Sequence, residues 1–493
     1  MTRGDTGQRG QILRRLKGMA GLSAASLLAG CILDPRVPAP VLDIPDRFIT
    51  GSTSRGDQHK YPMAFEAYRS RMLVDLVSQA RAANLDIAAA VARIQQADAQ
   101  VRIATQPLIP ALDFIGNADQ SYGGQAPARG QSRNISAALN ASYELDFWGR
   151  NRAGRYAAQA TALASRFDGA TIAIETDASV ADTYFQAIAL RKRIAVAKQN
   201  LGTATGTLRA VQARNEAGTA SGLDLAQQET LVANLRVVIP PLEQSYAQFV
   251  HALAVLLGQP PEHFKLGGED LFAIRVPAIA AGLPSDLLRQ RPDIAAAEAN
   301  LAAARFDVSA ARAALFPSIQ LTGQGGFAST ALKTLFRPDS LFYQIGASLT
   351  QPLLSAYGLR AQLDFDRARY AELLETYRKA IISAFRDVED ALIAYKKTSE
   401  QERLQQSAVT SARRAFEISE VQLRSGVIDL TTLLSVQQNV FSGEDALAQA
   451  RLARLQAVLS LYRAIGGGWQ RPADTAIAQV PVEIAVPVPV KLK

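Results

Sequence analysis

The stretch NISAALNASYELDF, residues 134–147, decides the fold expected for this chain of 493 residues. Its apolar side chains stand at every second position and polar ones fill most positions between them, which is the pattern of a half-exposed β-strand. Residues 341–351 repeat this alternation, and residues 110–122 and 317–328 follow it less cleanly. The sequence therefore predicts four strands of about ten to fourteen residues each, the length of a tilted membrane-spanning strand.

Four strands are too few to close a membrane barrel within one chain. The same pattern would also suit two hairpins half-buried against helices in a soluble protein, and that alternative stays open. In lipid, an open sheet edge leaves backbone N–H and C=O groups unpaired, so the sheet must close. Two chains would supply eight strands and three would supply twelve, and only the larger barrel leaves water inside. Aromatic side chains near the strand ends are candidates for the membrane interface: Phe147, Trp148, Tyr122, Phe327 and Phe342.

The chain contains the same unit twice, at an offset of about 208 residues. The segment that begins at Leu85 matches the one that begins at Pro292, and the glycine turn at Gly218 matches the one at Gly426. A near-constant offset across separate landmarks indicates two structural repeats. The expected domains are a signal peptide (1–30), an acylated linker (31–60), two repeats (61–280 and 281–469) and an extended tail (470–493).

Each repeat is expected to be mainly helical outside its strands. An alanine-rich helix ended by a proline comes first, then the strands, a very long helix, a glycine turn and a returning helix. The expected helices are 66–106, 151–216 and 223–257 in the first repeat, and 285–314, 358–424 and 429–465 in the second. At ~1.5 Å per residue each long helix reaches about 100 Å and needs neighbouring helices along its length. Pro240 and Pro241 are expected to kink or end the first returning helix.

The long helix of the second repeat carries a coiled-coil seam. Its apolar residues step by four and three: Ile381, Phe385, Val388, Leu392 and Tyr395.

The first thirty residues have the layout of an export signal. Five basic residues precede a short apolar run, from Met19 to Ala29, that is too short to span a bilayer. The stretch from Leu28 to Cys31 resembles the lipobox of bacterial lipoproteins, which implies cleavage before Cys31 and its acylation. The alternative is a free cysteine near the start of the chain. Ile32 follows in place of the aspartate that would signal inner-membrane retention, so the resemblance favours the outer membrane.

Composition and spacing point away from several classes of function. The formal charge of +8 falls to +4 without residues 1–30, and no Lys/Arg block is interleaved with aromatics, so nucleic-acid binding has little support. The three histidines, His59, His251 and His263, lack metal-ligand spacing. The glycines at 466–468 end a helix rather than follow a strand, so they form no phosphate loop. We expect no catalytic site, cofactor or metal.

Several motifs together resemble the outer-membrane efflux proteins of the TolC/OprM type, in their NodT-like lipoprotein branch. They are RPDIAAAEANLAAARFDVSAARAALFPSI (291–319), AFRDVEDAL (384–392), LYRAIGGGW (461–469) and the two glycine turns. The resemblance implies a mainly α trimer with a twelve-stranded membrane β-barrel, four strands per chain, continuous with a periplasmic helical barrel. Residues 258–284 would form a girdle midway. Such proteins are exit ducts that meet a periplasmic adaptor and an inner-membrane pump, expected here to be of the RND type.

The resemblance also implies that function lies at the periplasmic tip, where Gly218 and Gly426 reverse the chain. Asp224 matches a family position in the network that closes the aperture, and Asp429 is the nearest acidic substitute in the second repeat. Thr432 and Ser435 stand where some members carry aspartates. Each acid also suits the positive end of a helix dipole at a helix start. Arg214 and Arg424 are candidates for adaptor contacts or for pairing with these acids, and solvated arginines remain an alternative.

Three functions stay open at this point. The first is a passive outer-membrane exit duct for small molecules driven by a pump. The second is a type I protein-secretion duct, and the third is a periplasmic scaffold lipoprotein that forms no channel. The lipobox and the RPDI block favour the first by resemblance.

Overall fold

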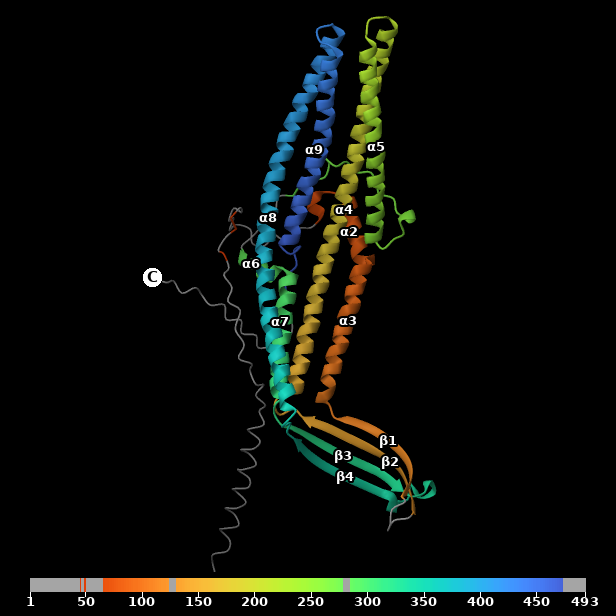
Figure 1. The fold of residues 1–493 in the computed structure, drawn as a ribbon, viewed down its shortest axis with the longest axis vertical. Coiled ribbons are helices and arrows are strands. Elements are labelled where there is room, and N and C mark those ends of the chain that lie inside the picture. The colour runs from red at the N-terminus through yellow and green to blue at the C-terminus, as the bar shows by residue number, and fades with distance from the viewer. Residues whose placement is uncertain (1–44, 46–47, 50–64, 124–129, 278–283, 473–493) are drawn as a thin grey trace, which may run out of the picture.

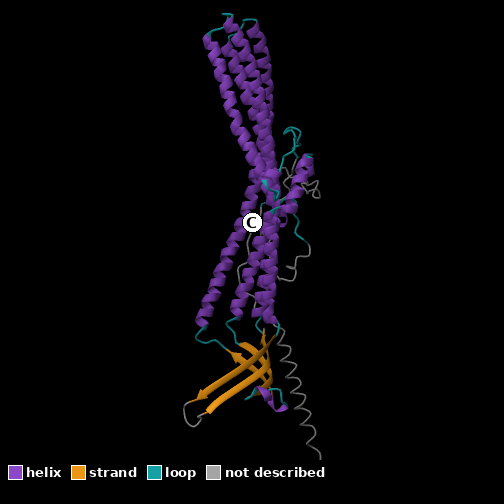
Figure 2. Ribbon diagram, turned by 90° about the vertical axis from the view of Figure 1, so that its right-hand side faces the viewer, coloured by secondary structure: helices purple, strands orange, loops and turns teal. Residues whose placement is uncertain are grey.

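The computed structural model of the chain describes residues 45, 48–49, 65–123, 130–277 and 284–472. These residues form an elongated molecule in which long helices run side by side and a β-sheet lies at one end (Figures 1 and 2). Cys31, the expected signal peptide, most of the expected linker and nearly all of the expected tail lie outside the described residues.

The sheet consists of antiparallel strands in the order β1-β2-β3-β4, so β1 and β4 are its edges (Figure 1). The strands are β1 Ala111–Gly123, β2 Gly130–Leu145, β3 Ser318–Ser329 and β4 Leu341–Thr350. Four strands per chain are therefore confirmed. The largest difference from the expected bounds is that β2 begins before residue 134.

The strand register places most of the apolar side chains on one face and most of the polar ones on the other, because directly opposed residues in a sheet point to the same side. One apolar row crosses the sheet through Phe114, Leu139, Gly325 and Tyr343. The next row, on the opposite face, runs through Asp113, Asn140, Gln324 and Gln344. The alternation seen in each segment thus adds up to a two-faced sheet.

The helices occur in the same order in the two halves of the chain. In the first half they are α2 Arg71–Ala83, α3 Leu85–Thr105, α4 Arg150–Glu216 and α5 Gly222–Leu256. In the second half they are α6 Pro284–Gln290, α7 Pro292–Ala313, α8 Ala356–Arg424 and α9 Leu430–Ala464. Within the described residues no helix combines the length and the apolar character that crossing a membrane would require.

The first helix of each half is broken, so the single helices expected over 66–106 and 285–314 are wrong. Asn84 leaves the helical conformation between α2 and α3, and its side-chain oxygen accepts bonds from the amides of Asp86 and Ile87. Its amide nitrogen donates to the carbonyl of Leu256 at 2.8 Å, which joins this break to α5. In the second half, Pro292 disfavours helical geometry at Arg291 and begins α7.

The long helices α4 and α8 pack against the returning helices α5 and α9 in two hairpins (Figure 1). The predicted seam of α8 is confirmed, because Ile381, Val388 and Leu392 are buried and Phe385 and Tyr395 are partly buried against core clusters.

The helix α5 continues through Pro240 and Pro241, so the expectation that these prolines could end it is wrong. Val232 before the prolines and Leu242 after them are both buried, so packing holds the helix on either side. The carbonyl of Val237 loses its helical donor to Pro241, and Val237 is exposed, so water can satisfy that oxygen.

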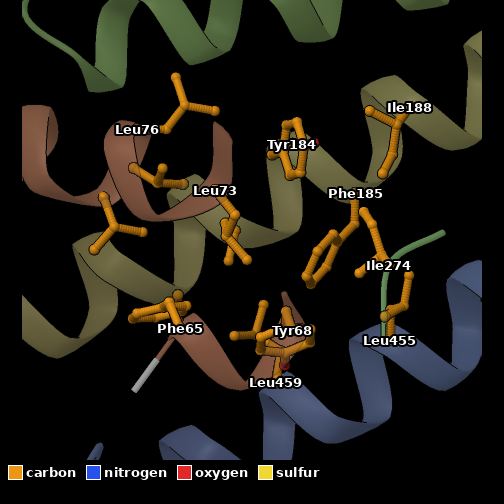
Figure 3. Packing of buried hydrophobic residues seen from close by; sticks show 14 of the residues in the cluster. Phe65, Tyr68, Leu73, Leu76, Tyr184, Phe185, Ile188, Ile274, Leu455 and Leu459 are labelled. Carbon is orange, nitrogen blue, oxygen red and sulfur yellow. The ribbon is translucent and has the colours of Figure 1, made fainter. Parts of the chain in front are cut away.

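The largest core lies midway along the helices, where α2 and residues 264–276 pack against α4 and α9. Tyr68, Tyr184 and Phe185 meet there, with Ile274 and Leu455 closing the other side (Figure 3). All five side chains are almost fully buried. The segment between the two halves therefore forms part of a packed waist, at the place expected for the girdle.

Candidate functional site

The first hairpin tip is a glycine turn between α4 and α5. Gly218 has a φ of +72°, in the left-handed region that residues with a Cβ adopt at a cost. The amide of Thr219 donates to the carbonyl of Arg214 at 2.8 Å, which satisfies an oxygen that the end of α4 leaves free. A Cβ at Gly218 would meet no atom within 4 Å, so the turn needs glycine for its conformation and not for space.

The second tip repeats this geometry between α8 and α9. Gly426 has a φ of +70°, and the amide of Val427 donates to the carbonyl of Gln422 at 2.9 Å. The two glycines matched in the sequence thus perform the same reversal at the ends of neighbouring hairpins (Figure 1).

The two acids predicted at the tip, Asp224 and Asp429, lie at the starts of the returning helices α5 and α9. Ser221 and Asp224 form a capping box, in which the Asp224 carboxylate accepts from the Ser221 amide and the Ser221 hydroxyl accepts from the Asp224 amide. Asp429 is the N-cap of α9 and accepts from the amide of Thr432 at 2.8 Å. The helix-start role considered for these acids is therefore present in both hairpins.

The environment of Asp429 favours its ionised form. Hydrogen bonds from the side chain and the amide of Thr432 lower the pKa of the Asp429 carboxyl below its usual value. Thr432 and Ser435 lie three residues apart on α9 and are both exposed. The first two turns of α9 therefore present the Asp429 carboxylate and the hydroxyl-bearing side chains of Thr432 and Ser435, all exposed in the chain.

Arg214 and Arg424 line one groove near the tip, with a volume of ≈ 630 Å³. Its walls come from α4, the end of α8 and Leu433 of α9, and Glu420 adds an acid to the lining. Among the ion pairs of the described residues, neither arginine pairs with Asp224 or Asp429, so within one chain the pairing alternative is not observed. Each arginine lies at the end of its long helix, whereas each acid caps the start of the returning one.

The polar face of the sheet is the second candidate surface. Its described charged side chains are all acidic: Asp113, Asp119 and Glu144. Glu144 pairs with Arg150 at 3.2 Å at the start of α4, whereas Asp113 and Asp119 are exposed. A closed barrel with this face inward would have a polar lumen of negative charge.

The prediction that Phe342 is an aromatic residue of the membrane interface is wrong. Phe327 is opposed to Leu341 in the register, which puts Phe342 on the other face of β4. Tyr122 and Phe327 belong to the apolar face. Trp148 lies at the junction of sheet and helices, where it stacks on Phe316 with ring centroids 4.7 Å apart and donates to the carbonyl of Pro317.

An ion cluster at the waist was not foreseen in the sequence. Glu402 of α8 accepts from Arg451 and Arg454 of α9, each at 2.9 Å, and Arg451 also donates to the carbonyl of Ile274. A signal was present, because Glu402 follows Tyr395 by seven residues and so continues the seam of α8. The cluster ties the second hairpin to the segment between the two halves.

Among the described residues, no group of three or more histidine, cysteine, aspartate or glutamate side chains could hold a metal ion.

Comparisons with known proteins agree on one family. A family model described as outer membrane efflux protein matches residues 76–259 and 283–467. The pyoverdine export outer membrane protein OpmQ of Pseudomonas aeruginosa is 39% identical, with 92% of this chain and 98% of OpmQ covered. The antibiotic efflux pump outer membrane protein ArpC of Pseudomonas putida is 32% identical, over 93% of this chain and 97% of ArpC.

A solved structure extends the agreement to the fold. The outer-membrane channel OprN superposes with a TM-score of 0.85 at 26% identity, over 90% of this chain and 100% of OprN. The strand order, the paired hairpins and the waist are therefore those of a TolC-type channel subunit. The chain belongs to the outer membrane efflux protein family and is the outer-membrane channel component of an efflux system.

Proposed function

We propose that three copies of this chain close into one passive duct that carries small molecules across the periplasm and the outer membrane. The observation that carries the proposal is the sheet of four strands with two unpaired edges and one apolar face. Joining β4 of one copy to β1 of the next pairs both edges and yields twelve strands, a barrel wide enough to hold water.

The two faces of the sheet give the barrel its orientation. The apolar face, with Phe114, Tyr343 and Ile345 exposed, would contact lipid. The polar face, with Asp113 and Gln344, would line the lumen. The apolar side chains left exposed on the outer surface of α8, such as Ile382 and Ile393, would be covered by helices of the neighbouring copies.

The tip would meet the partners of the duct. We propose that Arg214 and Arg424, with the glycine turns at Gly218 and Gly426, contact a periplasmic adaptor that connects to an inner-membrane pump of the RND type. Asp224, Asp429, Thr432 and Ser435 would narrow the aperture at the threefold axis. The capping bonds of the two acids support this role indirectly, because they hold the carboxylates in fixed positions.

The cargo class is supported by the relatives. OpmQ is named for pyoverdine export and ArpC for antibiotic efflux, and this chain is similar to both along almost its whole length. Pyoverdine and antibiotics are small organic molecules, so these names favour small-molecule efflux over protein secretion. The energy for transport would come from the pump, so the duct itself needs no catalytic site.

Cys31 would add a lipid anchor to the barrel. It lies outside the described residues, and the proposal rests on the signal-like start of the chain and the lipobox-like stretch before Cys31. Several acyl chains hold a protein in a membrane far more durably than one. Loss of labelling by radioactive palmitate in a Cys31→Ser variant would support the anchor, and unchanged labelling would contradict it.

Planar-bilayer recording of the purified protein tests the duct. The proposal predicts discrete conductance steps and an oligomer whose migration in gels changes on heating. Mass measurement in detergent should give three chains per particle. A protein that stays silent in bilayers and migrates as a monomer in the absence of detergent would instead be a scaffold.

A further inference from the structure

The polar face of the sheet contains one row of residues that is apolar from edge to edge. Ile115 is opposed to Ala138 in the register, Ala138 to Gly326, and Gly326 to Phe342. We name these four residues the apolar row. The neighbouring row on the same face is polar throughout and includes Asp113 and Gln344, so the apolar row interrupts a hydrophilic surface.

The middle of the apolar row is shielded from solvent. Ala138 is only 4% exposed, although Gly326 beside it has no side chain. The larger members, Ile115 and Phe342, stand at the two ends of the row, where they can lean over the small residues between them. The side-chain oxygen of Asn140 on the adjacent row is buried and has no hydrogen-bond partner among the described residues, which indicates that its neighbours exclude water there.

Gly326 allows β2 to approach β3 closely in this row. A Cβ at this position would lie 2.2 Å from the carbonyl oxygen of Ala137 and 2.5 Å from the Cα of Ala138. Both distances are too short for a Cβ beside backbone atoms, so only glycine fits without a shift of the strands. The surface over Gly326 is therefore free of any side chain of its own, and the phenyl ring of Phe342 is the nearest large apolar group in the row.

We propose that the apolar row is a contact site for aromatic organic cations as they pass through the lumen. The inference rests on the proposed trimeric duct, because only closure of the sheet turns the polar face into a lumen. Closure joins β4, which carries Phe342, to the strand β1 that carries Ile115 and Asp113. Each copy then contributes the phenyl ring of Phe342, the aliphatic side chain of Ile115 and the carboxylate of Asp113 to the lining of the same lumen.

The dimensions of such a barrel leave the passage open. Twelve strands spaced ~4.8 Å apart and tilted by ~40° enclose a backbone cylinder roughly 24 Å across. Three phenyl rings narrow this lumen but do not fill it, so water and ions continue to pass. A cargo molecule with an aromatic ring gains a stacking partner that a non-aromatic molecule of the same charge lacks, while Asp113 attracts the positive charge of both.

Single-channel recording with two probes separates these contributions. Tetraphenylphosphonium carries aromatic rings, and tetrabutylammonium has the same charge without them. From the stacking energy of an aromatic pair, we expect Phe342→Ser to shorten the current blocks caused by tetraphenylphosphonium about threefold to tenfold. Those of tetrabutylammonium should shorten by a smaller factor, because that ion loses its attraction to the ring but no ring–ring stacking. Phe342→Tyr, which keeps the ring, should keep the wild-type block duration.

Gln344→Ser is the matched control, because Gln344 lies on the same strand and face, two residues from Phe342. It should leave the tetraphenylphosphonium blocks unchanged. If Phe342→Ser does not assemble, Phe342→Leu replaces it, since leucine keeps an apolar side chain without the ring and should also shorten the blocks.

Two results would overturn the contact site: equal block durations in wild type and the Phe342 variants without a ring, or equal shortening in Gln344→Ser. Conductance steps that persist in either case would leave the duct intact. A wild-type protein without conductance steps would contradict the duct itself.

Discussion

Arg81 of α2 holds Asp177 of α4 through both carboxylate oxygens, with Nη2 2.6 Å from Oδ2 and Nε 3.0 Å from Oδ1. The Asp177 side chain is 3% exposed, whereas that of Arg81 is 57% exposed. Burial raises the pKa of the Asp177 carboxyl, and the bonds from Arg81 oppose that rise. The pair attaches α2 to α4 beside the core at the waist.

Arg81→Ala should lower the free energy of unfolding by ~2–3 kcal/mol at pH 7, less than for a fully buried pair because water already screens the guanidinium. The carboxyl left behind has a raised folded-state pKa and becomes easier to protonate. As the pH falls from 7, protonation of the Asp177 carboxyl therefore stabilises the folded variant relative to the unfolded chain. The loss should be smaller at pH 5 than at pH 7.

Thermal unfolding of the detergent-solubilised protein at the two pH values checks this prediction. Arg81→Lys is the control, since it keeps the charge without the two-pronged contact and should show an intermediate loss. A destabilisation of Arg81→Ala that is the same at both pH values would argue against a buried carboxylate as its cause.

Gly218→Ala and Gly426→Ala should each destabilise their hairpin by about 1 kcal/mol. Their φ values of +72° and +70° lie where a Cβ is unfavourable, and no neighbouring atom adds a clash. Gly202→Ala is the matched control, because Gly202 lies inside α4, has open space at its Cβ position and should gain ~0.5–1 kcal/mol. Hydrogen exchange of the hairpin amides measures both effects, and opposite signs are expected.

Asp429 should make the start of α9 sensitive to acid. Its folded-state pKa is lowered, so its contribution is fully present above the unfolded-state value of about 3.9 and is lost as pH falls through the folded-state value. Protection of the Thr432 amide against hydrogen exchange should therefore fall between pH 5 and pH 3, after correction for the intrinsic rate. Asp429→Asn keeps a neutral cap, and an equally strong pH dependence in that variant would rule out this carboxylate as the source.

Gly326→Ala should prevent or slow assembly of the barrel, because its Cβ meets the backbone of β2 at 2.2 and 2.5 Å. Gly323→Ala on the same strand should assemble normally, since its Cβ meets only the Ala141 side chain, at 4.0 Å. The fraction of heat-modifiable oligomer in outer-membrane preparations distinguishes the two variants. Equal oligomer fractions would show that β2 and β3 can separate enough to admit the methyl group.

The sequence by itself determined the repeating elements of this protein. Strand alternation and helix seams depend on which side chains are apolar at periods of two and three to four residues, and that information is local. The glycine turns at Gly218 and Gly426 were equally readable, because only glycine reaches their backbone conformation cheaply. The duplicated spacing then indicated that both halves repeat one plan, and the family followed from motifs in the second half.

Tertiary structure alone decided what these elements touch. Asn84 caps α3 through local bonds to the amides of Asp86 and Ile87, but only the fold brings its side-chain amide nitrogen to the carbonyl of Leu256, 172 residues away. Pro240 and Pro241 fail to end α5 because the neighbouring residues are packed on α4. Alternation along β4 puts Phe342 on the same face as Gln344, but only pairing with β3 places it opposite Gly326. Contacts between residues distant in sequence supply the free energy that overrides local preference, and no local pattern encodes them.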